Sequence, residues 1–330
     1  MKKVEKVGVF FLAACMLTAA LSCGSGQGSG TASATSNSPL IGSASEEYYM
    51  VTFLSGIDYW KICFDGMEDA AALYGVTPQY TGQIDADAAG QVAVLEQVVA
   101  KRPKGIALTC VDAYALADTI NNAIAQGIQV ITFDSDSPTS NRPMYVSTDA
   151  EVAGLTAGQF MAPKVAGKQG KVACVFTIGQ YNEEMKYAAF ESYLKENAPN
   201  ISLIKVSDGG DTTRAADNMA AALQANNDIV GIFCISGISG SVVPTVVKES
   251  GRRNQITVLT YDVDKAVLDM LKSGDIDASM AQGQYNMGYW SMVHLYHLAH
   301  NLSKEPPPGF VDTGSFVVTK NEADKYYITD

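Results

Sequence analysis

Two stretches of the chain, 130–136 and 258–264, have nearly the same pattern, and they constrain the fold more than any other feature. Each is a short run of β-branched, aliphatic and aromatic residues that is followed by two carboxylates. The first of these carboxylates is Asp134 in one stretch and Asp262 in the other. Such a run is typical of a strand buried in a parallel sheet. In open α/β sheets, ligands bind at the carboxyl ends of the strands. We therefore predict two similar sheets in two lobes that face each other, each contributing an aspartate to one site.

Strand-length apolar runs alternate with segments of helical period along most of the chain. This alternation predicts βαβ units and an α/β fold with two Rossmann-like parallel-sheet lobes, between which the chain crosses more than once. The expected strands are 48–54, 77–81, 105–109, 130–134, 144–148, 170–176, 202–206, 229–235, 257–261, 278–282 and 315–318. The expected helices are 59–74, 86–101, 113–126, 150–165, 183–196, 212–225, 242–249, 265–273 and 287–302.

The first residues have the pattern of an export signal. Lys2, Lys3 and Lys6 precede an uncharged run over 7–21, which is shorter than the roughly 20 residues that span a bilayer. A retained membrane helix is the alternative interpretation. The run ends in Ala-Leu-Ser-Cys-Gly, which resembles the lipobox of bacterial lipoproteins, so the resemblance implies a signal peptide over 1–22 and an acylated Cys23.

Small and polar residues dominate the segment that follows, up to Ser45. A segment of this composition cannot bury enough apolar surface to offset the entropy of ordering it, so 23–45 is predicted to be a flexible tether. A lipid anchor, a tether and a folded body place the protein outside the cytoplasmic membrane, on its outer face in the periplasm or at the cell surface.

The net charge limits which partners are expected, and the surroundings of the cysteines limit which disulfides are expected. The formal net charge of −12 disfavours binding to nucleic acid or to anionic lipid through charge. Cys63, Cys110, Cys174 and Cys234 lie in apolar surroundings, where buried free thiols are expected. A disulfide between Cys174 and Cys234 stays open as the alternative, because export permits disulfides.

Several motifs, taken in order over 48–318, resemble the type I periplasmic sugar-binding proteins of ABC importers, and the ribose-binding family in particular. They are Asp58-Tyr59-Trp60 with Asp65-Gly66-Met67, the run 130–136, Ser147-Thr148-Asp149 with Ala153-Gly154, Thr260-Tyr261-Asp262, and Ala281-Gln282. The resemblance implies a three-stranded hinge with crossings near Thr148, Gln282 and Asp312. It thus implies an N-terminal lobe of 46–148 plus 283–311, a C-terminal lobe of 149–282 plus 312–330, an ABC permease as partner, and a monomer.

The expected ligand is a monosaccharide or a similar polyhydroxylated small molecule. A sugar offers apolar C–H faces and hydroxyl groups, so its site needs flat aromatic rings together with carboxylates or amides. The candidate ligand-binding residues are Tyr59, Trp60, Asp134, Ser135, Lys186, Ser236, Asp262 and Gln282. Core packing is the alternative role for the two aromatic residues, and helix capping or turn formation is the alternative for the two aspartates.

Two of these positions depart from the ribose-binding pattern. Lys186 stands where the family commonly has an arginine, and Ser236 begins the Ser-Gly pair found where the family often has Asn-Asp. A lysine is a point charge without the planar fork of arginine. The departures put ribose itself in question and leave another pentose, a hexose, a polyol or a sugar-like signal open.

Patterns typical of enzymes and of metal or cofactor sites are missing from the sequence. It has no nucleophile elbow, Walker A loop or dinucleotide fingerprint, and its histidines, at 294, 297 and 300, spread over about 120° of one expected helix. We therefore expect no catalysis, no metal and no cofactor. Two functions stay open: delivery of the solute to an ABC importer, or presentation of the ligand-closed form to a sensor kinase or chemoreceptor.

Overall fold

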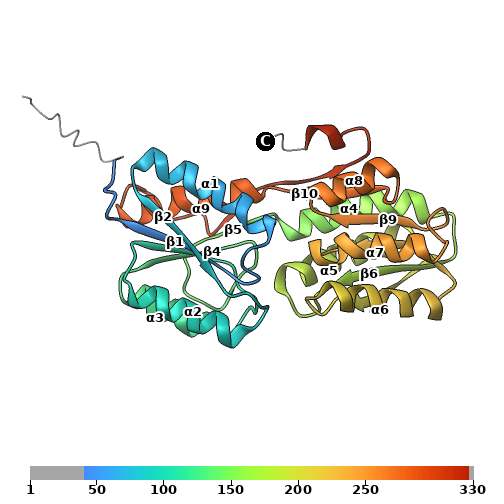
Figure 1. Cartoon of the computed structure of the whole chain (residues 1–330), viewed down its shortest axis with the longest axis horizontal. Helices are drawn as coiled ribbons and strands as arrows, with labels where there is room; N and C mark the ends of the chain where they lie inside the picture. The colour runs from blue at the N-terminus through green and yellow to red at the C-terminus, as the bar shows by residue number, and fades with distance from the viewer. Residues whose placement is uncertain (1–40, 327–330) are drawn as a thin grey trace, which may run out of the picture. The chain divides into compact units, whose positions relative to one another are not determined.

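The computed structural model describes residues 41–326, which form two six-stranded sheets with helices on both faces (Figure 1). The first sheet has the order β11-β5-β4-β3-β1-β2, and the second has the order β12-β10-β9-β8-β6-β7. All neighbouring strands are parallel except β12, which pairs antiparallel with β10 at the edge of the second sheet. The α/β fold with two Rossmann-like lobes is thus confirmed.

The first sheet consists of β1 (Glu47–Thr52), β2 (Thr77–Gly82), β3 (Gly105–Leu108), β4 (Gln129–Phe133), β5 (Tyr145–Ser147) and β11 (Phe310–Asp312). Helices α1 (Asp58–Tyr74) and α9 (Gln284–Ala299) pack on one face, and α2 (Ala88–Ala100) and α3 (Ala117–Ala125) pack on the other (Figure 1). Two apolar layers therefore bury both faces of the inner strands, which explains why β3 and β4 are nearly continuous apolar runs, whereas the edge strands β2 and β11 are more polar and less buried.

The second sheet consists of β6 (Gly170–Phe176), β7 (Ile201–Ser207), β8 (Ile229–Cys234), β9 (Thr257–Tyr261), β10 (Ala278–Gln282) and β12 (Ser315–Val318). Helices α4 (Ala150–Val165) and α5 (Tyr181–Asn197) cover one face. The other face is covered by α6 (Thr212–Ala225), α7 (Gly237–Glu249) and α8 (Lys265–Ser273), and a short 3₁₀ turn, Ala323–Lys325, follows β12.

The chain passes between the two sheets three times: after β5, after β10 and after β11. The first and third passages are hydrogen-bonded to each other, since Thr148 Oγ1 donates to the Gly314 carbonyl at 3.2 Å and the Asp149 amide donates to Asp312 at 2.9 Å. Gly283 brings the second passage alongside, because a Cβ there would lie 2.4 Å from the Thr313 carbonyl oxygen. The passages form the predicted three-stranded hinge, while the residue ranges assigned to each lobe remain a prediction.

Two helix starts differ from the sequence expectation by four residues or more. Helix α3 begins at Ala117 rather than near residue 113, because the Asp112 carboxylate accepts from the amides of Tyr114 and Ala115 and closes a turn there. Helix α7 begins at Gly237 rather than Val242, since Ser236 caps it by accepting from the Ser239 amide at 3.1 Å. Strand β11 was not expected at all.

Helices α1 and α9 approach each other closely at two glycines. A Cβ at Gly288 would lie 1.6 Å from the Cys63 carbonyl oxygen, and a Cβ at Gly66 would lie 2.1 Å from the Tyr285 carbonyl oxygen. Only glycine allows this backbone contact. The contact fixes α1 against α9 and thereby sets where the first turn of α1, with Tyr59 and Trp60, meets the strand ends.

The described N-terminal residues are bonded to the first lobe. The Gly42 amide donates to the Tyr74 carbonyl at 2.7 Å, and Thr77 Oγ1 donates to the Ala44 carbonyl at 2.8 Å. The predicted end of the tether at Ser45 is therefore a few residues too late. The predicted signal peptide and Cys23 lie outside the described residues. Within residues 41–326, every helix is too short or too polar to cross a bilayer.

The four cysteines of the described region are buried and free, as expected. The alternative disulfide is wrong, because Cys174 packs with the α4 and α5 layer whereas Cys234 packs with the α6 and α7 layer. On paired strands β6 and β8, Cys174 stands opposite Phe233, and Cys234 stands opposite Val175. The two thiols point to opposite faces of the sheet and cannot meet.

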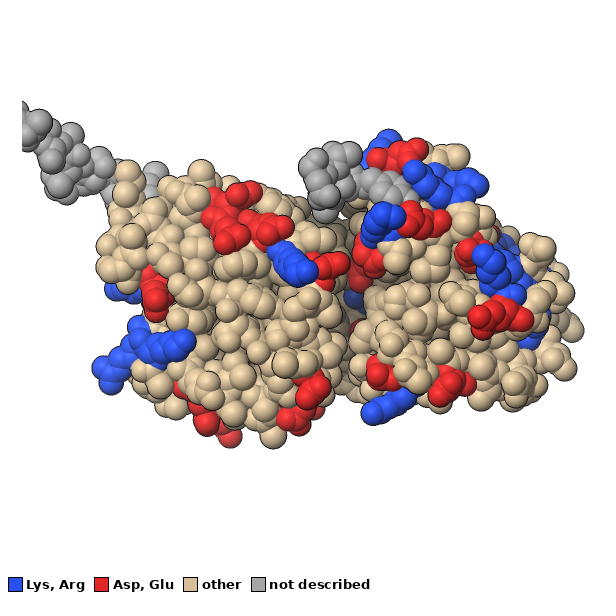
Figure 2. Space-filling model, in the orientation of Figure 1, with Lys and Arg blue, Asp and Glu red and all other residues tan. Residues whose placement is uncertain are grey.

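Charged side chains of both signs are scattered over the face seen in Figure 2, with acidic ones gathered over α1. The exposed acidic residues of this helix are Asp58, Asp65, Glu68 and Asp69. This face therefore carries no basic stripe of the kind that follows a nucleic-acid backbone.

Candidate functional site

A cavity of about 650 Å³ is lined by residues from both lobes, at the carboxyl ends of the strands. Its volume lies in the usual range for small-molecule sites. The predicted residues that line it are Tyr59, Trp60, Asp134, Lys186, Ser236, Asp262 and Gln282. The structure thus brings all but one of the sequence-predicted residues to a single cavity, although their binding role remains a proposal.

Asp134 is the first residue after β4 and has a left-handed backbone, with φ of 58°. Its amide donates to the Val146 carbonyl at 3.1 Å, which ties the turn to β5. Its carboxylate accepts from the Tyr59 hydroxyl at 2.7 Å and from Thr109 Oγ1 at 3.4 Å. Burial raises the pKa of Asp134, while the charge of Lys186 opposes that rise.

Asp262 repeats this arrangement after β9, with φ of 67° and its amide donating to the Met280 carbonyl at 2.8 Å. Its carboxylate accepts from Gln282 Nε2 at 2.7 Å and from Gln284 Nε2 at 3.4 Å. Burial raises the pKa of Asp262 to about 7, against the opposing effects of the hydrogen bond from Gln282 and of the charge of Lys186. Gln282, at the end of β10, therefore orients Asp262 and lines the cavity as well.

The sequence left two roles open for Tyr59 and Trp60, which are core packing and a place in the ligand site. Trp60 combines both positions. It is 3% exposed and packs edge-on against Phe53, Tyr59 and Phe133, so it belongs to the core of the first lobe. It also lines the cavity, and its Nε1–H has no partner in the structure. A buried indole N–H normally finds an acceptor, so this one is an unsatisfied donor in the wall of the cavity.

Lys186 lies on α5 and is 3% exposed. Its Nζ is centred over the ring of Tyr261 at 4.2 Å, and its charge lowers the pKa of Asp134, Glu183 and Asp262 against the effect of burial. No hydrogen bond from Nζ to a described residue is formed. Its N–H donors are therefore free to meet acceptors in the cavity.

Asn182, one turn before Lys186 on α5, makes a contact between the lobes across the cavity. Its Nδ2 donates to the Asp134 carbonyl at 3.3 Å, and that carbonyl also accepts from the hydroxyls of Tyr145 and Ser147. Its Oδ1 is buried without a partner. Asn182 is not among the residues that the sequence predicted for the site.

Glu183 and Asp208 are two further acidic residues that the sequence reasoning missed. Glu183 lines the cavity, and Asp208, directly after β7, is fully buried and accepts from Ser236 Oγ at 2.5 Å. Asp208 repeats the strand-then-aspartate pattern of Asp134, which could have revealed it. Glu183 had no such signal, because it appears only as one of several acidic residues where a helix begins.

Ser135 is the predicted residue that does not reach the cavity. The left-handed turn at Asp134 folds the chain back, so the Ser135 amide donates to the Phe133 carbonyl at 2.7 Å. Its own carbonyl accepts from the Cys110 amide at 3.0 Å, and the residue is buried behind the strand ends. Ser135 thus lies outside the lining of the cavity, and its predicted role in ligand binding stays an untested prediction.

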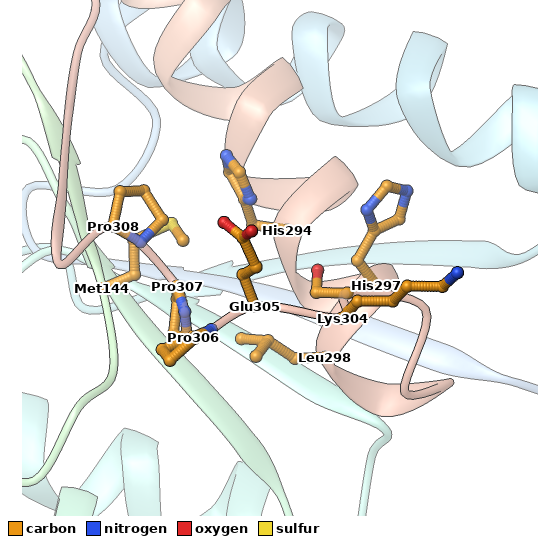
Figure 3. Close-up of a pocket in the computed structure, with 10 residues that line it drawn as sticks. Met144, His294, His297, Leu298, Lys304, Glu305, Pro306, Pro307 and Pro308 are labelled. Atoms are coloured by element: carbon orange, nitrogen blue, oxygen red, sulfur yellow. The ribbon is translucent and has the colours of Figure 1, made fainter.

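A second pocket of about 370 Å³ lies beside the last turns of α9 and is lined by Met144, His294, His297, Leu298 and residues 303–308 (Figure 3). Figure 3 shows the side chains of Glu305 and His294 directed toward one another. His300 points elsewhere and pairs with Glu46 at 2.7 Å. In the part of the chain that the structure describes, no three potential ligand side chains are grouped as a metal site.

Comparisons with known proteins agree with this geometry. The sequence profile described as periplasmic binding protein domain matches residues 48–303. The solved sugar-binding protein of a sugar ABC transporter from Bacillus halodurans is 37% identical with a TM-score of 0.79, and the match covers 86% of this chain and 100% of that one.

Two further relatives are described by their ligands. The structure of an arabinose-binding protein from Geobacillus stearothermophilus is 36% identical with a TM-score of 0.75, covering 86% of this chain and 99% of that one. A xylose/arabinose-binding protein of Sulfolobus acidocaldarius is 22% identical over 280 residues, which are 80% of this chain and 68% of that protein.

Proposed function

We propose that this chain, which belongs to the periplasmic binding protein family as a type I sugar-binding protein of the ABC importer class, captures a pentose in the cavity and delivers it to an ABC importer. The observation that carries the proposal is the pair of aspartates, Asp134 and Asp262, which enter one cavity from the two lobes in matching left-handed turns. Proteins of this family bind solutes and are not enzymes.

A sugar satisfies the polar groups that the cavity leaves unpaired. Lys186 Nζ and Trp60 Nε1 offer donors, and Asn182 Oδ1 offers an acceptor. A buried polar group without a partner costs about 1 to 3 kcal/mol, and each sugar hydroxyl can both donate and accept. The carboxylates of Asp134 and Asp262 accept hydrogen bonds from sugar hydroxyl groups. A polyhydroxylated ligand therefore suits the cavity better than an apolar one.

The size of a pentose permits useful affinity. It has roughly 10 heavy atoms, and at roughly 0.7 to 1 kcal/mol per atom the binding free energy reaches about −7 to −10 kcal/mol. This range corresponds to a roughly micromolar or tighter dissociation constant. Such affinity is suited to collecting a nutrient from dilute solution.

Arabinose is the first candidate among pentoses. Two of the relatives are described as arabinose-binding or xylose/arabinose-binding proteins, and one of them is 36% identical over nearly its whole length. Lys186 and Ser236, which depart from the ribose-binding pattern, both line the cavity and argue against ribose as the ligand.

Delivery depends on closure of the two lobes around the sugar. The aspartates, the aromatic pair and Lys186 come from different lobes, so all of them contact one ligand only when the cleft is shut. The sugar thereby shifts the balance of open and closed forms toward the closed one. A permease that recognises the closed form receives only loaded protein.

The family works outside the cytoplasm, and we propose Cys23 as the lipid attachment site. Cys23→Ala is expected to release the protein from membranes of the native host into the soluble extract. Mass spectrometry of the mature N-terminus is the direct readout. An unmodified mature N-terminus upstream or downstream of Cys23 in the wild type would contradict the anchor.

A thermal-shift panel tests sugar capture. The wild-type protein is incubated with L-arabinose, D-arabinose, D-xylose, D-ribose, hexoses and polyols, each at millimolar concentration. Arabinose is expected to raise the melting temperature the most, because a ligand at about a hundred times its dissociation constant stabilises by about 2.7 kcal/mol. Absence of stabilisation by every sugar would contradict the proposal.

A further inference from the structure

Glu183 lines the cavity but has no role in the site described so far. It is the third residue of α5 and is buried. Its Oε2 accepts from the Thr177 amide at 2.8 Å. Its Oε1 has no hydrogen-bond partner within residues 41–326.

A second buried carboxylate is linked to Glu183 through the same threonine. Asp208 Oδ1 accepts from Thr177 Oγ1 at 2.7 Å and from the Gly210 amide at 3.0 Å, and its Oδ2 accepts from Ser236 Oγ. Asp208 thus has three donors, whereas Glu183 has one. Since hydrogen bonds to the charged form favour ionisation, Glu183, with a single donor, is the carboxyl group that more readily retains its proton.

The charges around Glu183 lead to the same assignment. The groups that face it are Asp208 after β7, Lys186 on α5, Asp134 after β4 and the phenol of Tyr261 at the end of β9. The charge of Lys186 also acts on Asp134 and Asp262, so this one cation is shared by three buried carboxyl groups, those of Glu183, Asp134 and Asp262. Burial and the charge of Asp208 together raise the pKa of Glu183 to about 8.

We propose that Glu183 is a specificity-determining residue of the cavity, which holds its proton at neutral pH and donates a hydrogen bond from Oε1 to an oxygen atom of the bound sugar. This inference rests on the proposed function, since it assigns a role toward the sugar. The residue differs in kind from Asp134 and Asp262, which accept hydrogen bonds from sugar hydroxyls. Glu183 instead requires an acceptor on the ligand, such as a ring oxygen or a hydroxyl oxygen.

Two consequences follow for binding. A donor that exists only in the protonated form is lost as the pH rises, so the fraction of protein competent to bind falls tenfold per pH unit well above the midpoint. A glutamine at this position keeps a donor at every pH, because its amide does not titrate.

Isothermal titration calorimetry between pH 6.5 and 9.5 tests the assignment. L-arabinose and D-arabinose are the probes, and the proteins are the wild type, Glu183→Gln, Glu183→Ala and Glu184→Gln. Glu184 is the matched control, because it neighbours Glu183 in sequence but pairs with Lys205 on the outer surface. Melting curves at each pH establish that every variant is folded.

The dissociation constant of the wild type and of Glu184→Gln is expected to rise about tenfold between pH 8 and 9.5, whereas that of Glu183→Gln stays nearly constant over the same range. Groups common to all four proteins, including Asp262, cancel when the slopes are compared. Glu183→Ala is expected to bind more weakly than the wild type at pH 6.5.

Parallel pH slopes for the wild type and Glu183→Gln, or wild-type affinity that increases above pH 8, would overturn the donor role while leaving sugar binding intact. Failure of folded wild-type protein to bind either arabinose or any other sugar of the panel would overturn the function, and this inference with it.

Discussion

Asp134 and Asp262 occupy equivalent positions in the two lobes. Each directly follows a central strand, each has a left-handed backbone, and the amide of each donates to a carbonyl on the neighbouring strand, at Val146 and Met280 respectively. Left-handed conformations are costly for residues other than glycine, and aspartate is among the few that tolerate them. Their repetition at matching places, with both carboxylates at one cavity, indicates a site rather than an accident of turn geometry.

Removal of either carboxylate is expected to weaken sugar binding. Asp134→Ala and Asp262→Ala should each cost at least about 2 kcal/mol of binding free energy, or roughly 30-fold in dissociation constant, because sugar hydroxyls lose their acceptor in a closed cavity. Titration calorimetry with arabinose measures the loss. Wild-type affinity in both variants would refute the paired-aspartate site.

A glycine variant and an alanine variant at position 134 separate the role of the Asp134 backbone from the role of its carboxylate. Asp134→Gly accepts the positive φ without penalty, whereas Asp134→Ala should lose about 1 kcal/mol more of folding stability. Both variants lack the carboxylate, so both should bind arabinose poorly. Urea unfolding of the two proteins gives the comparison, and an alanine variant as stable as the glycine variant would show that the turn carries no such cost.

The hydrogen bond from Asn182 to the Asp134 carbonyl joins the two lobes directly, without a ligand between them. Asn182→Ala is expected to shift the ligand-free protein toward more open forms, which increases the radius of gyration in small-angle X-ray scattering. Asn197→Ala is a matched control, since Asn197 bonds to Tyr193 on an exposed part of the same helix. Identical scattering from the wild type, Asn182→Ala and Asn197→Ala would show that the Asn182 contact does not hold the lobes together.

Folding stability is expected to decline as the pH rises toward 8, partly because of Glu183. Burial and the charge of Asp208 raise its pKa from 4.5 to about 8, so the native state holds a proton that the unfolded chain has lost across that window. A single such group lowers the free energy of unfolding by up to about 1.4 kcal/mol per pH unit as the pH rises.

Glu183→Gln removes this titration, so its advantage in stability over the wild type should grow from pH 5 to pH 8. Chemical denaturation at several pH values measures the difference, with Glu184→Gln as the control. Parallel stability profiles for the wild type and Glu183→Gln would show that Glu183 does not bind a proton on folding.

Because α1 and α9 are in backbone contact, one added methyl group between them is expected to lower the stability of the protein. Gly288→Ala places a Cβ against the Cys63 carbonyl and should destabilise the protein by roughly 1 to 3 kcal/mol. Gly167→Ala, where the added Cβ meets nothing within 4 Å, should change stability by less than about 0.5 kcal/mol. Melting temperatures that rank the two variants in the opposite order would contradict this packing.

The strand ends were the most predictable part of the molecule. Asp134 and Asp262 were identified from a repeated local pattern, because a buried parallel strand has a composition of its own and its carboxyl end is where ligands bind. The positions of Tyr59, Trp60, Lys186 and Gln282 at the same cavity followed from the order of elements and from the family resemblance.

The parts that sequence reasoning missed depend on tertiary contacts. The position of Ser135 depends on the direction of one backbone turn, which reverses the chain after Asp134. The role of Glu183 depends on Asp208, which comes from another strand, and on a shared bond to Thr177. A local pattern cannot predict which carboxylates will be buried together or how many donors each will receive.

A crystal structure of the protein with arabinose, or with the panel sugar that stabilises it most, tests the central claim most directly. We predict one sugar in the cavity between the lobes, with hydroxyl oxygens at hydrogen-bonding distance, roughly 2.6 to 3.2 Å, from both Asp134 and Asp262. A sugar bound elsewhere, or in the cavity without contact to either aspartate, would contradict it.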